Sequence, residues 1–404
     1  MITLKLITIS QLTPGMFVQN VTKQTGNVKI KTQGWVKTQA QIDKLKKAGI
    51  LEIEIDDVKV IETAPEKPTN ESNIDVSTDS IKKYDPWETT HSAEQEMAKA
   101  KMLYEEARLL QIKAFSEIKS GLNIDTKPFR KLASSFMDSI FRNQDALACL
   151  TQMRKKDAYL LEHSINVSIL MGIFAKHLNI DKAIITELTT GALLHDIGKI
   201  KIPDEILNKP GRFTDEEFTI MNKHSFYSKE ILEGSGVKGI ALDIAGLHHE
   251  RLDGKGYPFG KKGDEISQYV RMASIVDVYD ALTAERVYKT SMAPIKAFKI
   301  LQEGCPDSFD AGLLTKFIQC IGIHPVGTLV KLTSQKVGLV TQSNPDNPLK
   351  PIVKTFYTTK HSRYTEVKDI DLSSKKTNET IESAIKSKDH DIDIERFYIN
   401  SILP

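Results

Sequence analysis

Hydrophobic residues follow two different periods along the chain. From Ser92 to about residue 323 they recur every three or four residues, which predicts a long series of helices. Near both ends, short stretches alternate apolar and polar residues or run apolar between turn residues, as strands do. The pattern therefore predicts a mainly α protein, in which an all-helical domain carries a small N-terminal α/β domain and a small C-terminal β extension.

Residues 1–62 predict the small mixed domain. Residues 28–35 resemble a strand, a short helix follows with Ile42 and Leu45, and residues 51–55 alternate Leu or Ile with Glu. We find no combination of residues here that is typical of a catalytic site. The domain is therefore interpreted as a sensory or docking domain.

A linker and a helical connector come next. Prolines among polar residues give residues 63–90 the composition of a linker, and residues 91–149 are rich in helix-forming residues. Within residues 92–120, small and apolar residues recur like a coiled-coil seam. The seam predicts either one amphipathic helix packed on its own domain or a homodimer through this helix. Its members are Met97, Ala100, Tyr104, Ala107, Gln111, Ala114 and Ile118.

The helical pattern continues through the central domain, residues 150–325. A capping box that begins at Thr214 predicts a helix running through His224. Three short β-like runs follow in residues 326–358 and predict the β extension. The polar residues 359–404 predict a loosely ordered tail.

Composition narrows the class of protein. The 404-residue chain has a net charge of +2 with 40% hydrophobic residues, which is typical of a soluble globular protein and gives no indication of DNA binding. Its three cysteines have no metal-binding or paired spacing, which favours a reducing, cytoplasmic setting. The sequence shows no signal peptide and no apolar stretch of the roughly 18 residues that a membrane span needs.

Histidine and aspartate recur in the central domain. A buried imidazole or carboxylate without a partner is costly, and so many in apolar helical contexts are best explained by one shared metal site. Histidine nitrogen and carboxylate oxygen together suit a divalent metal, and the nearby cation Lys199 suits a phosphate. The candidate residues are His163, His195, Asp196, His224, His248, His249 and Asp277.

Four ordered motifs lie in this domain. They are His195-Asp196-Ile197-Gly198-Lys199, residues 202–211, residues 248–258 ending in Gly256-Tyr257-Pro258, and residues 277–289. With these motifs the domain resembles an HD-GYP domain, a branch of the HD phosphohydrolase superfamily that cleaves cyclic dinucleotides. Residues 1–62 resemble a poorly characterised domain often found before HD-GYP domains, and residues 324–357 resemble their frequent C-terminal β extension.

The resemblance implies a site for two divalent metal ions, usually iron or manganese. It makes all seven candidate residues metal ligands, with Asp196 bridging the two ions. His163, His195 and Asp277 then lean to one metal and the histidines 224, 248 and 249 to the other. Some family members bind a third metal through a Glu four residues before the first His. This chain has Tyr159 there, so we expect two metals.

The resemblance also implies substrate contacts. Arg286 and Lys289 match positions that contact the substrate, and we expect them to hold phosphate oxygens. Lys199 is expected to neutralise charge on the phosphate. Asp196 and Lys199 are the expected catalytic residues. From the residues alone, Arg286 and Lys289 also fit an ordinary solvated helix end. Asp280, one turn after Asp277, is expected to orient a ligand or a water.

Two further segments bear on specificity. The Gly256-Tyr257-Pro258 loop is expected to contact protein partners and to shape the site. The segment Ser225-Phe226-Tyr227-Ser228 is bulkier than is usual in the family, which leaves the substrate base open.

The expected function is a metal-dependent phosphodiesterase that opens cyclic di-GMP to linear pGpG, with further hydrolysis to GMP left open. Two alternatives remain. One is a phosphodiesterase for 3′,3′-cyclic GMP-AMP, and the other is a weakly active cyclic-dinucleotide receptor that signals through the Gly256–Pro258 loop or the N-terminal domain.

Overall fold

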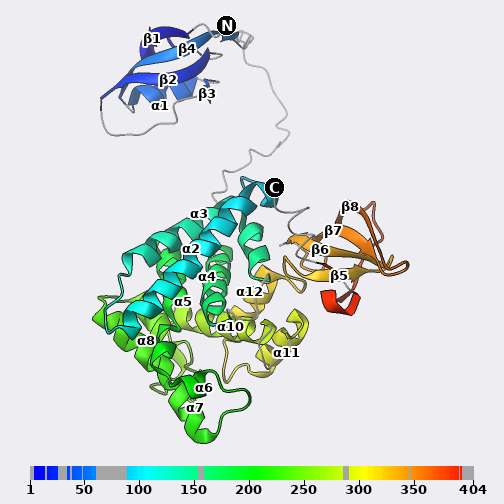
Figure 1. Cartoon of the computed structure of the whole chain (residues 1–404). Helices are drawn as coiled ribbons and strands as arrows, with labels where there is room; N and C mark the ends of the chain where they lie inside the picture. Colours follow the sequence, from blue (N-terminus) through cyan, green and yellow to red (C-terminus); the bar gives the residue numbers. More distant parts are fainter. Residues whose placement is uncertain are drawn as a thin grey trace, which may run out of the picture. The chain divides into compact units, whose positions relative to one another are not determined.

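The computed structural model describes residues 4–13, 16–25, 34–36, 39–47, 49–60, 89–152, 159–284, 291–344, 347–390 and 392–393. The chain divides into two compact units, residues 1–82 and residues 83–404 (Figure 1). The predicted fold class is confirmed: a helical body, a small N-terminal α/β unit and a small C-terminal sheet. The boundary drawn at residue 149 between a connector and a central domain stays a prediction.

The N-terminal unit is a four-stranded antiparallel sheet with strand order β1-β4-β2-β3. Ile53 and Ile55 of β4 are buried, as the alternation with Glu predicts, whereas Leu51 is 41% exposed. The predicted strand at residues 28–35 lies largely outside the described residues, apart from β3 at its end. The elements are β1 (Leu4–Thr8), η1 (Ile9–Gln11), β2 (Met16–Gln24), β3 (Gly34–Trp35), α1 (Gln39–Lys47) and β4 (Ile50–Val60).

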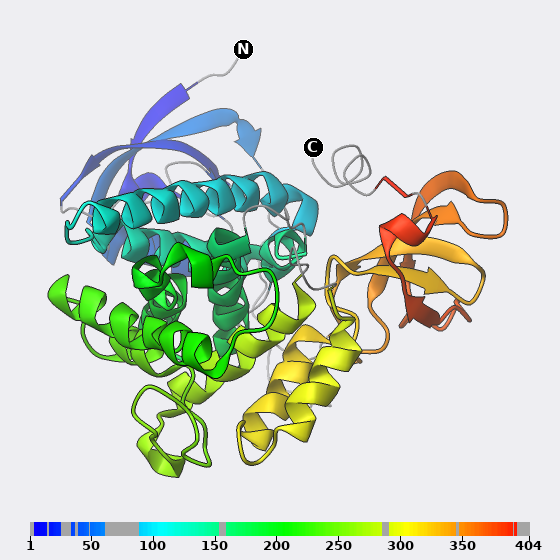
Figure 2. The same ribbon diagram turned by 60° about the horizontal axis from the view of Figure 1, so that its bottom comes forward.

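The second unit is built on long packed helices, and Figure 2 shows α11 and α12 side by side within it. The helices are α2 (Ala93–Lys119), α3 (Lys127–Leu150), α4 (Tyr159–His177), α5 (Lys182–Leu194), α6 (Asp204–Leu207), α7 (Asp215–Met221), α8 (Lys223–Gly234), α9 (Ile240–Leu247), α10 (Gln268–Thr283), α11 (Pro294–Glu303) and α12 (Ala311–Ile321). Short 3₁₀ turns are η3 (Ile197–Lys201), η4 (Gly263–Glu265) and η5 (Ser387–His390). None of the helices within the described ranges is long and apolar enough to cross a membrane.

Helix α4 is the centre of this unit. Its residues 165–175 are all buried, and it packs against α2, α3, α5, α10 and α12. A helix that is apolar nearly all round has to be covered on every side, and α4 is covered in this way. Because α4 also carries His163, the hydrophobic core holds one candidate site residue firmly in place.

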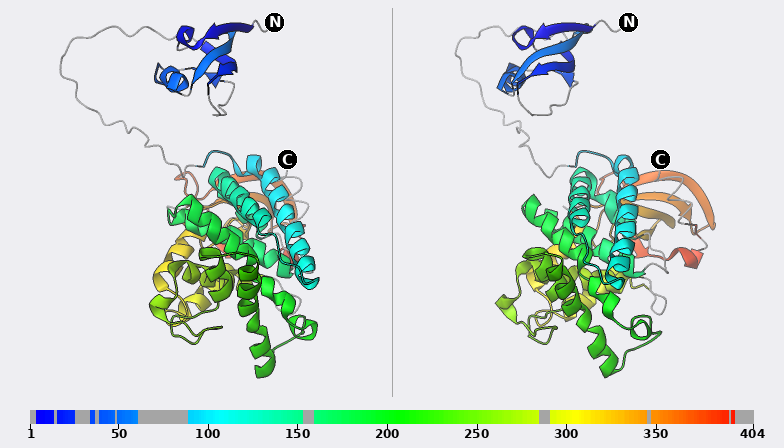
Figure 3. Two further views of the ribbon diagram at one scale, coloured as in Figure 1. Left: turned by 90° about the vertical axis from the view of Figure 1, so that its left-hand side faces the viewer. Right: turned by 60° about the vertical axis from the view of Figure 1, so that its left-hand side comes forward.

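Helix α2 lies along the outside of the helical body in both views of Figure 3. Ser92 caps its start by accepting a hydrogen bond from the backbone N–H of Gln95. Six of the seven seam residues, from Met97 to Ala114, are buried and the seventh, Ile118, packs partly buried against the same core. The interpretation of one amphipathic helix packed on its own domain therefore describes this face of α2.

The helix predicted to run from Asp215 through His224 is interrupted. Helix α7 ends at Met221 and α8 begins at Lys223. Side chains occupy the carbonyls at this junction: Nδ1 of His224 lies 2.7 Å from the Met221 carbonyl oxygen, and the Ser225 hydroxyl donates to that of Asn222. His224 therefore sits at the start of a new helix, and the prediction of a continuous helix was wrong.

The C-terminal part is a five-stranded antiparallel sheet with the order β8-β7-β6-β5-β9. Its strands are β5 (Leu329–Leu332), β6 (Lys336–Gln342), β7 (Ile352–Thr358), β8 (Arg363–Asp371) and β9 (Ile381–Ala384). The interpretation of residues 359–404 as a loosely ordered tail was wrong, because β8 and β9 lie there. Strand β8 is an edge strand exposed along almost all of its length, so backbone pairing with β7 forms it without a hydrophobic pattern.

Candidate metal centre

Five helices bring all seven candidate ligands together. His163 comes from α4, His195 and Asp196 follow the end of α5, and His224 stands in the first turn of α8. The pair His248–His249 follows the end of α9, and Asp277 comes from α10. All are buried except His249, which is partly exposed. The positions singled out from the sequence therefore form one cluster.

The turn that presents His195 and Asp196 is held by side chains from other elements. A helix leaves its last carbonyls without partners in the helix. Here Nδ1 of His195 lies 2.7 Å from the Ala192 carbonyl oxygen, and the Gln111 amide on α2 donates to that of Leu193. The Ser228 hydroxyl donates to the His195 carbonyl at 2.6 Å. The end of α5 is thus capped from two sides.

Helix α8 is pressed against the same turn. The Ser228 hydroxyl also accepts a hydrogen bond from the Gly198 N–H at 2.9 Å. A Cβ on Gly198 would lie only 2.1 Å from the His224 carbonyl oxygen and 2.3 Å from the Ser228 nitrogen. Glycine at this position therefore lets the turn with His195 and the helix with His224 approach each other.

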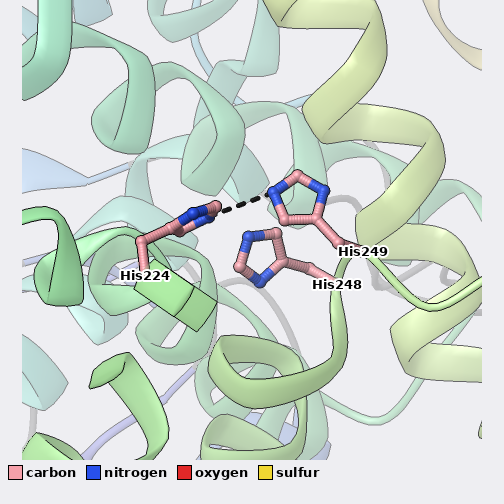
Figure 4. Close-up of side chains that lie close together, drawn as sticks. All are labelled: His224, His248 and His249. Atoms are coloured by element: carbon pink, nitrogen blue, oxygen red, sulfur yellow. Dashed lines mark hydrogen bonds between the residues drawn. The ribbon is translucent and has the colours of Figure 1, made fainter. Parts of the chain in front are cut away.

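The ligand atoms form three overlapping groups of three, and two of these groups share no residue. The available donor atoms of His163, His195 and Asp277 lie within 4.8 Å of one another, and those of His224, His248 and His249 do the same. Figure 4 shows the three rings of the second group converging, with Nε2 of His249 3.1 Å from Nε2 of His224. Metal-binding histidines are commonly oriented by a carbonyl at the other ring nitrogen. The Nδ1 atoms of His195, His224 and His248 all face backbone carbonyls in this way.

Asp196 lies between the two groups. Its Oδ1 is 3.4 Å from Nε2 of His224, whereas its Oδ2 is 3.3 Å from Nε2 of His195 and 3.6 Å from Nε2 of His163. Each oxygen of one carboxylate therefore faces a different group of three. A carboxylate can serve two cations in this arrangement because its two oxygens each carry lone pairs.

Burial and charge set the protonation of the site. Burial lowers the pKa of His224 to about 4 and that of His249 to about 3, and it lowers the pKa of His248 strongly. These three imidazoles are therefore neutral at pH 7, the form that binds metals. Burial would also lower the pKa of His163, but hydrogen bonds and charges from Asp277 and Asp280 raise it to about 9.

The carboxylates of the site are held ionised. Burial alone would raise the pKa of Asp196, but the charges of His195 and Lys199 hold it well below its ordinary value. The pKa of Asp277 is also well below its ordinary value, because the hydrogen bond and charge of His163 outweigh burial. The ionised carboxylates of Asp196 and Asp277 and the neutral imidazoles of the histidines 224, 248 and 249 form a mixed donor set that divalent transition metals accept.

Three buried atoms in the centre have no hydrogen-bond partner among the residues that the structure describes. They are Nε2 of His195, Oδ1 of Asp196 and Nε2 of His248. The ligand atoms of these three residues lie within 4.8 Å of one another. A buried polar atom without a partner is costly unless something else binds it. The donor set therefore fits a bound cation.

The remaining candidate residues lie in different places. Nδ1 of His163 lies 2.8 Å from Oδ2 of Asp280, and Nζ of Lys199 lies 2.5 Å from Oδ2 of Asp196. Lys199 belongs to η3, the turn that follows α5, and its contact with Asp196 is made within three residues of the chain. Arg286 and Lys289 lie outside the described residues.

The Gly256–Pro258 loop covers one side of the cluster. The Tyr257 ring lies 4.7 Å from the His249 ring. Glu250, which is 2% exposed, accepts hydrogen bonds from the backbone N–H groups of Phe259 and Lys261 and so fixes the loop. Neither Glu250 nor Ser228 was singled out from the sequence as a residue that positions the site. The place of Glu250 directly after two histidines was the only signal for it, and a lone Ser gives none.

The bulky segment after His224 splits between core and surface. Ser225 and Ser228 are buried, whereas Phe226 is 40% exposed, with its ring 6.5 Å from that of Phe259. The two serines of the segment are thus buried, whereas the bulky Phe226 side chain faces outward, beside the Gly256–Pro258 loop.

Comparison with known families matches three segments. An HD domain model matches residues 135–313, a domain of unknown function (DUF3391) matches residues 4–129, and a KOW domain associated with HD domains matches residues 329–391. The KOW match spans β5 to β9, so it covers the predicted β extension together with the two strands that lie in the predicted tail. The match to DUF3391 takes in α2 as well as the N-terminal unit.

Similarity to individual proteins covers different shares of the chain. A cyclic di-GMP phosphodiesterase of Pseudomonas aeruginosa is 32% identical over 357 residues, which cover 88% of this chain and 85% of the relative. A 3′3′-cGAMP-specific phosphodiesterase of Vibrio cholerae is 36% identical over 170 residues, covering 42% of this chain and 37% of the relative. An HDG"Y"P protein from Bdellovibrio bacteriovorus superposes with a TM-score of 0.46 at 14% identity, covering 78% of this chain and 98% of that one. The chain belongs to the HD-GYP family of phosphodiesterases.

Proposed function

We propose that the chain is a metal-dependent phosphodiesterase that hydrolyses cyclic di-GMP to linear pGpG. The observation that carries the proposal is the position of Asp196, whose two oxygens face two separate groups of three ligand-competent residues. The name and extent of the relative from Pseudomonas aeruginosa support the substrate.

The proposed ligands divide as the geometry groups them. His163, His195 and Asp277 hold one divalent ion, the histidines 224, 248 and 249 hold the other, and Asp196 serves both. Two such ions, when bound, lower the pKa of a shared water and stabilise charge on the phosphoryl oxygens. Asp280 fixes the tautomer of His163 through its contact with Nδ1.

Lys199 supplies the positive charge for the substrate. Its ammonium is paired with Asp196 in the structure, and its side chain is 16% exposed, so it lies at the edge of the buried cluster. A scissile phosphate that enters the site meets this ammonium as negative charge develops on its oxygens. We extend the phosphate contacts to Arg286 and Lys289 on the strength of their motif positions.

The metals are proposed to be iron or manganese, two per chain. Mixed imidazole and carboxylate ligands admit both metals. Nothing among the matched motifs supplies the Glu of a third site, since Tyr159 stands at that position.

The test is hydrolysis of cyclic di-GMP by protein reconstituted anaerobically with Fe²⁺ or Mn²⁺, with product chromatography and metal analysis on the same sample. We expect pGpG to accumulate and about two metals per chain. Failure to cleave any cyclic dinucleotide at full metal occupancy would refute the proposal. A consistent third metal would overturn the inference drawn from Tyr159.

The same assay decides between substrates. The Vibrio cholerae relative named for 3′3′-cGAMP makes that compound the second candidate, because the proposed ligands do not distinguish the bases. Parallel turnover measurements give the preference as a ratio of kcat/KM. Tight binding of either dinucleotide without cleavage would favour the receptor alternative.

Two partner predictions take a more definite form. The predicted seam of α2 is buried within the chain, so a homodimer through residues 92–120 has to use the outer face, where Met102 and Leu109 are exposed. A protein partner at the Gly256–Pro258 loop contacts a segment that touches His249 through Tyr257. Light scattering of the purified protein tests the dimer.

A further inference from the structure

Two buried polar side chains of α2 contact the helices that carry candidate metal ligands. Tyr104 and Gln111 lie two turns apart on its inner face among Ala, Leu and Met, and the other buried polar residue of α2, Glu96, pairs with Arg142 near the start of the helix. Burying a tyrosine hydroxyl and a primary amide within an apolar interface is costly unless both find partners. Both partners belong to the helices that carry proposed ligands.

The first contact ends at the His195–Asp196 turn. The Gln111 amide donates to the carbonyl oxygen of Leu193, two residues before His195. That carbonyl belongs to the last turn of α5, where intrahelical partners run out. The cap comes from a helix 82 positions away in sequence. Position and tilt of this helix end therefore depend on where α2 sits.

The second contact ends beside His163. The Tyr104 hydroxyl donates to Oδ1 of Asn166 at 2.9 Å, and Asn166 is fully buried in α4, three residues after His163. Residues three apart on a helix lie on the same side, one turn from each other. The two contacts of α2 thus lie next to two members of the same ligand group, His163 and His195.

We propose that Tyr104 and Gln111 are positioning residues through which α2 sets the geometry of the group formed by His163, His195 and Asp277. The proposal rests on the proposed function of that group as a metal site. The DUF3391 match includes α2. One part of that domain would therefore act in positioning the metal site. A shift of α2 along its axis changes both contacts together and alters the metal site without touching a ligand.

The variants for the test are Gln111→Met, which keeps the length of the side chain but has no donor, and Tyr104→Phe, which removes only the hydroxyl. Leu103→Met is the matched control, since Leu103 is equally buried on α2 and the change nearly conserves volume. Each variant is titrated as apoprotein with Mn²⁺, assayed for kcat and KM with cyclic di-GMP, and unfolded thermally.

We expect Gln111→Met to lose about 10- to 100-fold in Mn²⁺ affinity for one of two ions or in kcat, the range typical of residues that orient metal ligands. Tyr104→Phe should show a smaller loss in the same quantity. KM should stay unchanged in both variants, and the Leu103→Met control should match the wild type in Mn²⁺ affinity and kcat. Unaltered Mn²⁺ affinity and kcat in both variants, whatever their melting temperature, would overturn the proposal. If Gln111→Met does not fold, Tyr104→Phe alone decides.

The outcome is separable from the proposed function. If the wild-type protein binds Mn²⁺ but cleaves no cyclic dinucleotide, the phosphodiesterase proposal fails. The Mn²⁺ titrations of the variants still show whether α2 positions the site. If the variants match wild-type affinity and turnover while the enzyme is active, only the role of α2 fails.

Discussion

The ammonium of Lys199 lies 2.5 Å from Oδ2 of Asp196, the oxygen that faces His163 and His195. The Lys199 ammonium, which is not a metal ligand, therefore contacts the same carboxylate that is proposed to bind the metals. Replacing Lys199 with Ala should leave two metals in place, because an ammonium is not a metal ligand. It should lower kcat by about 10²–10³, the scale for one preorganised charge donor. Metal analysis and turnover on one preparation measure both effects.

Lys201, on the same short turn, is the natural control for Lys199. Its side chain is 42% exposed and pairs with Glu230 on the surface. Lys201→Ala should therefore leave kcat unchanged. Normal turnover of Lys199→Ala with full metal would place that residue outside the site and weaken the assignments of Arg286 and Lys289.

Asp196→Ala tests the bridging carboxylate. No neighbouring side chain can replace both of its oxygens, so hydrolysis should fall to background and metal content should drop below two per chain. The fold should survive, since the core around α4 does not include this side chain. Elemental analysis, activity and circular dichroism check the three parts. Full activity in this variant would exclude the mechanism.

Gly198→Ala tests the close approach of α8. The added Cβ meets backbone atoms of His224 and Ser228, which cannot move aside as a flexible side chain can. We expect a loss of about 1–3 kcal/mol in the free energy of unfolding, together with weaker metal binding. Gly234→Ala, at the other end of α8, is the control because a Cβ there meets nothing within 4 Å. Equal effects of the two substitutions would contradict the packing argument.

Asp145, which is not among the candidate metal ligands, gives a prediction for how the free energy of unfolding depends on pH. This carboxyl on α3 accepts a hydrogen bond from Ser343, and burial raises its pKa from 3.8 to about 6 despite that bond. Between these two pKa values the folded protein therefore holds a proton on Asp145 that the unfolded chain has released. The stability that this proton gives is present below pH 3.8 and is lost as the pH rises through 6.

Asp145→Asn should consequently stabilise the protein at pH 7.5, by at most about 3 kcal/mol at 1.36 kcal/mol per pKa unit. The advantage should nearly vanish by about pH 3, below both pKa values, where the wild-type carboxyl is largely protonated in both states. Urea unfolding of both proteins at the two pH values measures it. An advantage of the same size at both would mean that Asp145 is ionised throughout.

The seven candidate ligands could be located from the sequence because each lies in a local motif or in an apolar helix where a polar residue stands out. Arrangement was harder. The position of Asp196 between two groups depends on α8 meeting the turn at Gly198, and no local pattern records that contact. Gln111 fitted the seam of its helix by spacing alone, and its bond to Leu193 crosses 82 positions.

The fold shows the same division. The helical body followed from the period of its apolar residues, whereas β8 escaped notice because its side chains face solvent. The break before His224 escaped because the polar contacts at the junction, such as that of the His224 ring with the Met221 carbonyl oxygen, follow no hydrophobic period. Hydrogen bonds between polar side chains and backbone atoms do not depend on a periodic pattern of hydrophobic residues, so such a pattern does not predict them.

The hydroxyl of Ser228 touches both ends of the segment from His195 to Gly198, donating at one end and accepting at the other. A single atom of α8 thereby closes this segment into a ring. Any fluctuation that frays the first two turns of α8 opens that ring and separates His224 from Asp196 at the same moment. In hydrogen exchange, we therefore expect the amides of the first turns of α8 and of the His195–Gly198 segment to belong to one cooperative opening unit, whose opening separates the two groups of candidate ligands.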